Sequence, residues 1–252
     1  MRIDKKILVV ATLVLALPVA AVQAAEGGPK LERANNDVSN RASLQRGARN
    51  FVNYCLGCHS AKYMRYSQIA EDLALTENEL QDNLMFTGTR VYDPILSSMP
   101  AEQAREWFGI APPDLSLIVR SRSADYVYTY LKSFYDDPSR PTGANNAVLP
   151  QTAMPDVLAG LQGRQKAKYE SKPDDDGKMI QHLVALESIA PGEMTAADFD
   201  AFVRDTVTFL EYVSEPAKSQ RRSLGVWVIL YLLMFTAFTY FLKKEYWKDV
   251  KD

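Results

Sequence analysis

The chain has 252 residues, of which 47% are hydrophobic and 24% are charged, and its formal net charge at pH 7 is −2. This composition fits a globular protein with one main core and added membrane segments. The charge is uneven, because residues 1–24 carry +2 and residues 215–252 carry +3, which leaves −7 for residues 25–214. An acidic domain of this kind argues against nucleic acid as a partner and is compatible with a basic partner protein.

The first 24 residues have the layout of a secretory signal peptide. Three basic residues precede an apolar run over residues 7–22, and the small residues that follow allow cleavage after Ala24 or Ala25. The alternative, a transmembrane anchor at the N-terminus, is disfavoured by Pro18 and by those small residues. The domain that follows is therefore expected to be exported.

The exported domain, residues 25–215, is expected to be mostly α-helical with long loops. Residues 26–40 are polar and aperiodic, which indicates a surface lead-in segment. Apolar residues from Leu44 to Cys55 recur at helical spacing, so a helix is expected to lead into the cysteine turn. Residues 62–110 show short helical stretches and no clear strand alternation.

Two helix starts and one long loop region are expected in the middle of the domain. Asp114 or Ser116 is the predicted cap of the first helix, and Ser123 or Asp125 is the predicted cap of the second. Residues 136–178 are rich in Pro, Gly, Asn and charge, which predicts loops.

A regular helix is predicted at the end of the domain. Thr195 is its expected cap, with Asp198 completing a weak capping box. An apolar stripe runs from Phe199 to Val213, and Pro216 marks the expected end of the helix.

A membrane anchor is predicted over residues 224–242, which are 19 uncharged residues in a row. At about 1.5 Å of rise per residue they nearly match the hydrocarbon core of a bilayer, whereas a buried core helix is the less favoured alternative. Residues 216–223 are interpreted as a basic hinge and residues 243–252 as a tail. Basic residues on both sides give a poor orientation signal. Export of residues 25–215 decides the topology: a single pass through a bacterial inner membrane, the domain in the periplasm and the tail in the cytoplasm.

Both cysteines of the chain and one of its two histidines lie in a C-x-x-C-H motif, at Cys55, Cys58 and His59. This motif is the attachment signature of c-type haem. Two thiols three positions apart lie near each other in one helical turn and can form thioethers with the two vinyl groups. The adjacent imidazole would be the proximal iron ligand. One covalent haem c is therefore expected.

Three other uses of the motif are less favoured. A disulfide between Cys55 and Cys58 would close a loop too short to give much chain-entropy benefit. A thioredoxin-like redox pair is expected just after a strand, whereas here an amphipathic helix leads in. Zinc would need further ligands, and only His182 remains among histidines and cysteines.

The sixth iron ligand is expected to be a methionine or His182, far along the chain, and a thioether would raise the reduction potential. Excluding those in the signal, in the anchor and next to His59, the methionines that remain are Met85, Met99, Met154, Met179 and Met194. Met154 stands out in a short loop between two prolines, and Met99 has similar local chemistry.

Several stretches together resemble the cytochrome c1 family, the haem subunit of the quinol:cytochrome c oxidoreductase (cytochrome bc1 complex). The resemblance covers roughly residues 46–248 and rests on RGARNFVNYCLGCHSAKYMRYS, APPDLSLIVRSRSADYV and TFLEYVSEPAKSQRRSLGVWVILYLLMF. The PPDLS segment with its arginine-rich helix, and the FL-x-x-x-x-EP junction before an anchor, are more specific than C-x-x-C-H alone.

The resemblance implies an electron-transfer subunit of the bacterial type. It would accept single electrons from the Rieske iron–sulfur subunit through haem c and pass them to a cytochrome c, beside cytochrome b in a dimeric complex within membrane lipid. Enzyme activity would belong to that complex, since the subunit makes and breaks no substrate bonds itself. The A-M-x motif of the family matches Met154 rather than Met99.

The resemblance also assigns Arg122 and Tyr126 to the haem propionates. A guanidinium and a phenol are suitable partners for carboxylates. Without the family, Arg122 would be interpreted as a solvated helix charge.

The chain departs from the family pattern in three places. Trp107 and Phe108 stand where mitochondrial members carry an Asn-rich stretch before the double proline. Residues 160–187 look like extra loop material. No cysteine remains for the stabilising disulfide found in some bacterial members.

Two other functions are weighed against this one. A free membrane-tethered c-type cytochrome, acting as an electron carrier outside the complex, predicts a long flexible linker, whereas the apolar helix at 199–213 runs almost directly into the anchor. A haem-free thiol–disulfide oxidoreductase would hold no covalent haem.

Overall fold

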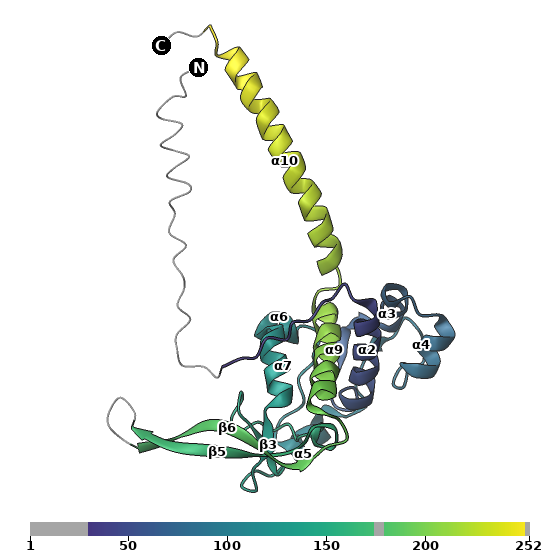
Figure 1. The fold of residues 1–252 in the computed structure, drawn as a ribbon. Coiled ribbons are helices and arrows are strands. Elements are labelled where there is room, and N and C mark those ends of the chain that lie inside the picture. The colour runs from purple at the N-terminus through teal and green to yellow at the C-terminus, as the bar shows by residue number, and fades with distance from the viewer. Residues whose placement is uncertain (1–29, 174–178, 250–252) are drawn as a thin grey trace. The chain divides into compact units, whose positions relative to one another are not determined.

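The computed structural model describes residues 30–173 and 179–249 (Figure 1). The predicted signal peptide, residues 1–24, and its cleavage site lie outside the described residues. The elements, in chain order, are α2 (Arg41–Tyr54), β1 (Ala61–Arg65), α3 (Tyr66–Leu73), α4 (Glu77–Asn83), β2 (Pro94–Ile95), α5 (Ala101–Phe108), α6 (Ile118–Arg122), α7 (Ala124–Lys132), β3 (Phe134–Asp136), β4 (Ala144–Asn146), α8 (Ala159–Gln162), β5 (Gly163–Pro173), β6 (Met179–Pro191), α9 (Ala196–Ser214) and α10 (Lys218–Tyr246).

The core is built around α2 and α9, which lie side by side (Figure 1). The rings of Phe51 and Phe209 are both buried, with centroids 5.6 Å apart. Gly47 lets the helices approach closely, because a Cβ there would lie 2.1 Å from the backbone oxygen of Asp205. The buried Asp205 carboxylate accepts hydrogen bonds from Ser43 Oγ at 2.5 Å and from Arg46 Nε at 2.5 Å. The helix predicted from Leu44 to the cysteine turn is confirmed.

The helix caps agree with the sequence in two of three cases. Ser123 Oγ accepts from the backbone N–H of Tyr126 at the start of α7, and Thr195 Oγ1 accepts from that of Asp198 at the start of α9. The cap predicted at Asp114 or Ser116 is wrong: α6 begins at Ile118 and has no side-chain cap.

Asp114 and Ser116 serve a different purpose, because they join the double-proline loop to β1. The Asp114 carboxylate accepts from the backbone N–H of Lys62 at 2.9 Å, and Ser116 Oγ accepts from that of Tyr63 at 3.1 Å. These two side chains therefore bind the backbone of β1 and do not cap the helix that follows them.

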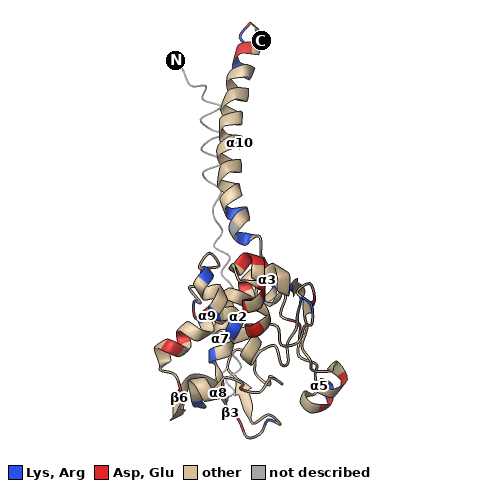
Figure 2. Cartoon of the chain, turned by 90° about the vertical axis from the view of Figure 1, so that its right-hand side faces the viewer, with Lys and Arg blue, Asp and Glu red and all other residues tan. Residues whose placement is uncertain are grey.

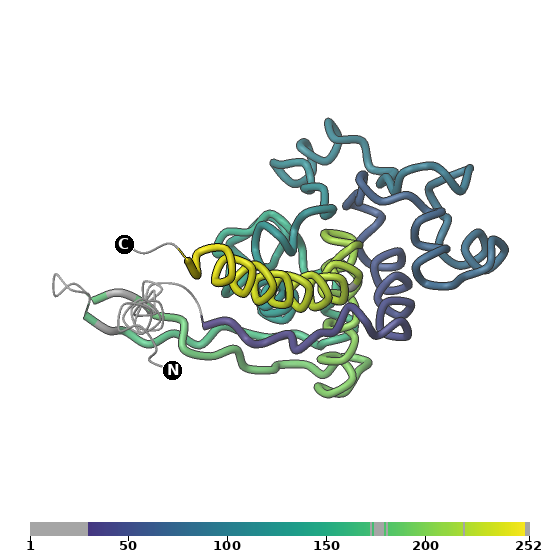
Figure 3. Tube along the Cα trace, turned by 90° about the horizontal axis from the view of Figure 1, so that it is seen from above, coloured from purple at the N-terminus to yellow at the C-terminus, as the bar shows by residue number. Residues whose placement is uncertain are grey.

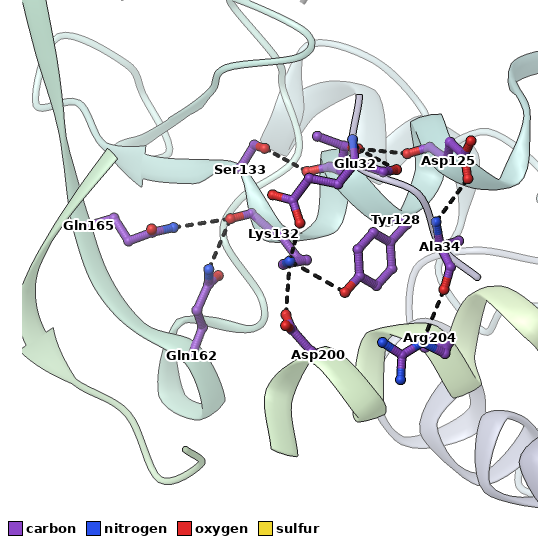
Figure 4. Close-up of polar contacts among 11 residues, drawn as sticks. Glu32, Ala34, Asp125, Tyr128, Lys132, Ser133, Gln162, Gln165, Asp200 and Arg204 are labelled. Carbon is purple, nitrogen blue, oxygen red and sulfur yellow. Dashed lines mark hydrogen bonds and ion pairs between the residues drawn. The ribbon is translucent and has the colours of Figure 1, made fainter. Parts of the chain in front are cut away.

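The lead-in segment before α2 is tied to α7 and α9 (Figure 4). Its backbone N–H groups at Glu32 and Ala34 donate to Thr129 Oγ1 and to the Asp125 carboxylate, each at 2.8 Å. Ala34 is fully buried, and its carbonyl accepts from Arg204 Nε at 3.0 Å. The segment therefore runs over the surface, as expected, but is held by polar side chains of two helices.

Lys132, at the end of α7, lies at the centre of an ion-pair cluster next to this segment (Figure 4). Its ammonium group is 2.5 Å from the Glu32 carboxylate and 2.8 Å from that of Asp200 in α9. The cluster joins the lead-in segment, α7 and α9 through one side chain.

Helices make up most of the regular structure, as expected, but the domain also contains strands. In residues 30–173 and 179–249 they form three two-stranded antiparallel sheets, β1–β2, β3–β4 and β5–β6. The short strands β1 and β2 lie where the sequence indicates short helical stretches and shows no clear strand alternation. The loops expected over 136–178 and 160–187 include the long β5–β6 pair. These two strands run side by side from Gly163↔Pro191 to Pro173↔Met179 (Figures 1 and 3).

The β5–β6 pair was missed because it lacks the alternation of apolar and polar residues that marks a half-buried strand. Polar or charged side chains fill most positions of β5, and the described apolar side chains of β6 are exposed or only half buried. Lys166 and Lys168 both pair with Glu187 across the strands. A ladder whose side chains remain largely in water has no buried face to impose a period of two on the sequence.

The C-terminal helix α10 is long and apolar enough, over Gln220–Tyr246, to cross a membrane. Its side chains are exposed along its length, and basic residues occupy its two ends with uncharged residues between them (Figure 2). The preceding helix α9 ends at Ser214, just before Pro216 as expected. Because α10 begins at Lys218, most of the segment interpreted as a hinge, 216–223, is helical.

Candidate functional site

A cavity of about 760 Å³ lies at the carboxyl end of α2 and brings together the six residues that the sequence singled out. These are Cys55, Cys58, His59, Arg122, Tyr126 and Met154. Its walls are mostly apolar and include Pro112, Pro113, Leu115, Ile118, Val127, Leu131, Leu149, Val157, Leu158 and Leu210. A large apolar pocket with a few convergent polar groups is typical of a cofactor site.

The two cysteines lie in a tight turn that continues α2. The backbone N–H of Cys55 donates to the Phe51 carbonyl at 2.8 Å, and those of Cys58 and His59 donate to the Cys55 carbonyl at 3.0 and 2.8 Å. Both cysteines are free thiols that line the cavity. The turn therefore presents both sulfur atoms and the adjacent imidazole to one space.

Burial raises the pKa of Cys55 to about 12 and also raises that of Cys58. A redox-active cysteine pair needs a lowered thiol pKa, because the thiolate is the nucleophile. This site therefore lacks the electrostatic property on which a thiol–disulfide oxidoreductase depends.

The orientation of His59 is set by the double-proline loop. Its Nδ1 lies 2.7 Å from the carbonyl oxygen of Pro113. Because that oxygen can only accept, Nδ1 carries the proton and Nε2 keeps its lone pair. Burial lowers the pKa of His59, which favours the neutral ring. A neutral imidazole whose other nitrogen donates to a backbone carbonyl is the usual form of a metal-ligating histidine.

Met154 lies in a loop that polar side chains hold in place. The Asn146 side-chain oxygen accepts from the backbone N–H of Val148 at 2.9 Å and from that of Leu149 at 3.2 Å. The Asn145 side-chain oxygen accepts from the backbone N–H of Gln151 at 2.8 Å. Asn145 and Asn146 are held in the ladder between β3 and β4, so their side-chain hydrogen bonds attach the methionine loop to this ladder.

Among the described residues, Met154 is the one methionine of the five candidates that lines this cavity. The rival Met99 lies before α5, and the other histidine, His182, is exposed in β6 opposite Glu170. Neither of them lines the cavity. Met99 nevertheless lies near the cysteine turn, because Ser97 Oγ donates to the Gly57 carbonyl at 2.9 Å.

Arg122 and Tyr126 come from successive helices and meet at the cavity. The guanidinium carbon of Arg122 lies 5.5 Å from the ring centroid of Tyr126, which is within the range of a cation–π contact. Ser123, between α6 and α7, has a φ of 81°, and this turn lets both side chains face the same space. Phe108 also lines the cavity, whereas Trp107 is exposed.

Sequence reasoning missed four residues around the site. Tyr130 OH lies 3.5 Å from Met154 Sδ and 2.9 Å from Thr152 Oγ1, and Asn145 and Asn146 hold the loop. The spacing of Tyr126 and Tyr130, four positions apart on one helix, could have placed Tyr130 at the site. No sequence signal marks the two asparagines, because they act on the backbone of a loop.

A helical domain with a C-x-x-C-H turn against a mostly apolar cavity has the organisation of a c-type cytochrome. The model of the cytochrome C1 family matches residues 35–250, and the chain therefore belongs to the cytochrome c1 family. A haem c cofactor is implied by that membership. The two free thiols, the His59 tautomer and the apolar walls fit this group.

Three relatives are similar over nearly their whole length. A cytochrome c1 from Allochromatium vinosum is 45% identical over 243 residues, which is 96% of this chain and 98% of that protein. A protein named ammonia monooxygenase gamma subunit, from Nitrosomonas europaea, is 40% identical over 240 residues, which is 94% of this chain and 97% of that protein. A cytochrome c1 from Rhodospirillum rubrum is 31% identical, and the match covers 99% of this chain and 98% of that protein.

Proposed function

We propose that the chain is the electron-transfer subunit of a quinol:cytochrome c oxidoreductase, the cytochrome bc1 complex. One haem c would be held covalently by Cys55 and Cys58, and His59 and Met154 would bind its iron. The observation that carries the proposal is the shared cavity: these four side chains come from two distant segments and line one mostly apolar space.

When bound, the haem iron takes up and releases one electron at a time. The contributions of the chain are structural and electrostatic. The turn after α2 presents both thiols, the Pro113 carbonyl keeps His59 in the ligating tautomer, and the apolar walls exclude water. A thioether ligand from Met154 raises the reduction potential, as needed in a carrier that draws electrons from a quinol-oxidising site.

Arg122 and Tyr126 are proposed to bind the haem propionates. Both line the cavity and both can donate hydrogen bonds to a carboxylate. A guanidinium beside the haem also favours the reduced state, because the added electron makes the site more negative.

The electrons are proposed to come from a Rieske iron–sulfur subunit and to leave to a cytochrome c. The subunit itself changes no substrate bond, so enzyme activity belongs to the complex. Cytochrome b and membrane lipid are the proposed neighbours of α10, whose exposed apolar side chains need a hydrophobic environment. The complex is proposed to be dimeric.

The haem domain is proposed to lie in the periplasm of a bacterium, with α10 as a single span of the inner membrane and residues 243–252 in the cytoplasm. The predicted signal peptide supports this orientation. The rival function, a free tethered cytochrome, needs a long linker, but only Glu215, Pro216 and Ala217 separate α9 from α10.

The proposal is tested on the full chain extracted from its native membrane in mild detergent. The alkaline pyridine haemochrome spectrum after denaturation is expected to show covalently retained haem c, and cytochrome b and a Rieske protein are expected to co-purify. Absence of covalent haem would contradict the cytochrome proposal as a whole.

The co-purifying proteins decide between assemblies. Haem with no cytochrome b would indicate the free tethered carrier, and haem with subunits of a monooxygenase would indicate the assembly named for the Nitrosomonas relative. His59→Ala is expected to abolish the ligated haem spectrum, whereas His182→Ala is the matched control, because the second histidine lies away from the cavity in β6.

A further inference from the structure

The phenol of Tyr130 lies between the proposed sixth ligand and a buried hydroxyl group. Tyr130 OH is 3.5 Å from Met154 Sδ, within hydrogen-bond range for sulfur, and 2.9 Å from Thr152 Oγ1. Tyr130 lines the cavity, and Thr152 is 5% exposed. None of the roles assigned above to the thiols, the imidazole or the propionate partners involves this phenol.

The ring of Tyr130 contacts two other aromatic rings. Tyr126 stacks against it with centroids 6.3 Å apart and an interplanar angle of 6°, and Phe134 makes an edge contact at 5.1 Å. The direction of the phenol is therefore set by packing and does not depend on its hydrogen bonds.

The methionine loop is also fixed independently of the phenol. The Asn146 side-chain amide donates to the backbone carbonyl of Tyr130 at 2.8 Å, while its oxygen accepts from the loop backbone at Val148 and Leu149. Removing the Tyr130 hydroxyl therefore leaves both the ring and the loop with their other restraints.

Counting protons assigns a direction to this contact. A phenol has one O–H and keeps it at neutral pH, and a thioether sulfur can only accept. If the phenol proton points to the sulfur, Thr152 must donate its own proton to the phenol oxygen. A thioether has two lone pairs, so a sulfur that binds iron with one can still accept a hydrogen bond with the other.

We propose that Tyr130 is a positioning residue for the sixth ligand: it donates a hydrogen bond to Met154 Sδ, as the second step of a chain that begins at Thr152 Oγ1. This inference rests on the proposed function, in which Met154 binds the haem iron. The hydrogen bond fixes which lone pair of the sulfur faces the metal. It also withdraws electron density from the sulfur, which weakens the sulfur as a ligand of ferric iron. A less electron-rich sulfur stabilises the reduced iron, so the bond raises the reduction potential.

The test compares Tyr130→Phe with the matched control Tyr128→Phe in the full chain with its haem. Tyr128 lies on the same helix, α7, and is buried, whereas Tyr130 is partly buried. The Tyr128 hydroxyl group is near Lys132, and Tyr128 does not line the cavity. The readouts are the midpoint potential, by redox titration, and the affinity of the ferric form for added imidazole, which competes with the methionine.

One hydrogen bond typically changes an equilibrium constant about three- to tenfold. Tyr130→Phe is therefore expected to lower the midpoint potential by about 30–60 mV for one electron. It is also expected to weaken imidazole binding to the ferric form about three- to tenfold, because the sulfur regains electron density and binds ferric iron more strongly. Tyr128→Phe is expected to change neither quantity. A Tyr130→Phe protein with an unchanged potential and unchanged imidazole affinity would overturn the inference.

Thr152→Val tests the direction of the chain. If the phenol proton points to the sulfur, loss of the Thr152 hydroxyl leaves the hydrogen bond from Tyr130 to Met154 Sδ in place. The midpoint potential is then expected to fall less than in Tyr130→Phe. A rise in potential would mean that the phenol had been donating to Thr152 and turns to the sulfur only in the variant, which would overturn the proposed direction.

The same preparations separate failure of this inference from failure of the proposed function. The pyridine haemochrome of the unmodified chain reports covalent haem, and its sulfur-to-iron charge-transfer band reports methionine ligation. If both are present and only the Tyr130 effect is missing, the inference fails and the function stands. If either is missing from the unmodified chain, the proposed haem site itself is wrong.

Discussion

Replacement of Gly47 by alanine tests the close packing of α2 on α9. A Cβ at this position would lie 2.1 Å from the backbone oxygen of Asp205 and 2.7 Å from Phe209 Cβ. The first of these distances is roughly 1.4 Å short of an ordinary contact of about 3.5 Å. Because the nearest atom belongs to helix backbone, no rotamer change can relieve the contact and the helices must move apart.

The expected cost follows from two opposing effects. Overpacking a core costs about 1–3 kcal/mol, and a contact against backbone belongs at the upper end of that range. Alanine gains about 1 kcal/mol over glycine inside a helix. The net loss in the free energy of unfolding is therefore about 2 kcal/mol, or about 4–8 °C in melting temperature for a domain of this size.

The assay is thermal unfolding of the full chain in detergent, followed by far-ultraviolet circular dichroism. Gly160→Ala is the matched control, because a Cβ there meets no atom of the described residues within 4 Å. It is expected to keep the melting temperature or raise it by at most about 2–4 °C, because alanine also favours the short helix α8. A Gly47→Ala protein as stable as the unmodified chain would refute the reasoning, since it would mean that α2 and α9 do not approach as closely as described.

Three further predictions concern the site and the ion-pair cluster. Met154→Leu is expected to keep covalent haem but lose the sulfur-to-iron charge-transfer band, whereas Met99→Leu keeps both; a retained band in the first variant would contradict the assignment. Arg122→Ala is expected to lower the midpoint potential without loss of haem, and Arg120→Ala, on the same helix but not at the cavity, should leave the potential unchanged. Burial alone would lower the pKa of Lys132, but its hydrogen bonds to two carboxylates outweigh burial and raise the pKa. The ion pairs therefore stabilise the folded state fully below the pKa of an unfolded lysine, about 10.4, and this stabilisation is lost as the pH rises further. Lys132→Met is thus expected to lower the free energy of unfolding by about 1 kcal/mol at pH 7, and this difference from the unmodified chain is expected to narrow in alkaline solution. Chemical denaturation at several pH values measures it, and a difference in unfolding free energy that does not depend on pH would contradict the prediction.

Much of the helical part could be predicted because its signals are local. Each of these signals acts on residues only a few positions away in the chain. Examples are the apolar spacing that leads to Cys55, the cap at Thr195 and the end of the helix before Pro216. The β5–β6 ladder could not be predicted in the same way, since strands that remain in water have no buried face to impose alternation.

The sequence by itself determined the chemistry that fits within one turn or one span: the C-x-x-C-H motif at Cys55, Cys58 and His59, and the uncharged run of α10. These features depend on spacing between near neighbours, which the chain carries directly. The family motifs also selected Met154, but only the tertiary structure brought its sulfur to the same cavity as the cysteine turn. It likewise decided the tautomer of His59 and the placement of the Tyr130 hydroxyl, because a carbonyl oxygen or a phenol from a distant segment acts through its position in space.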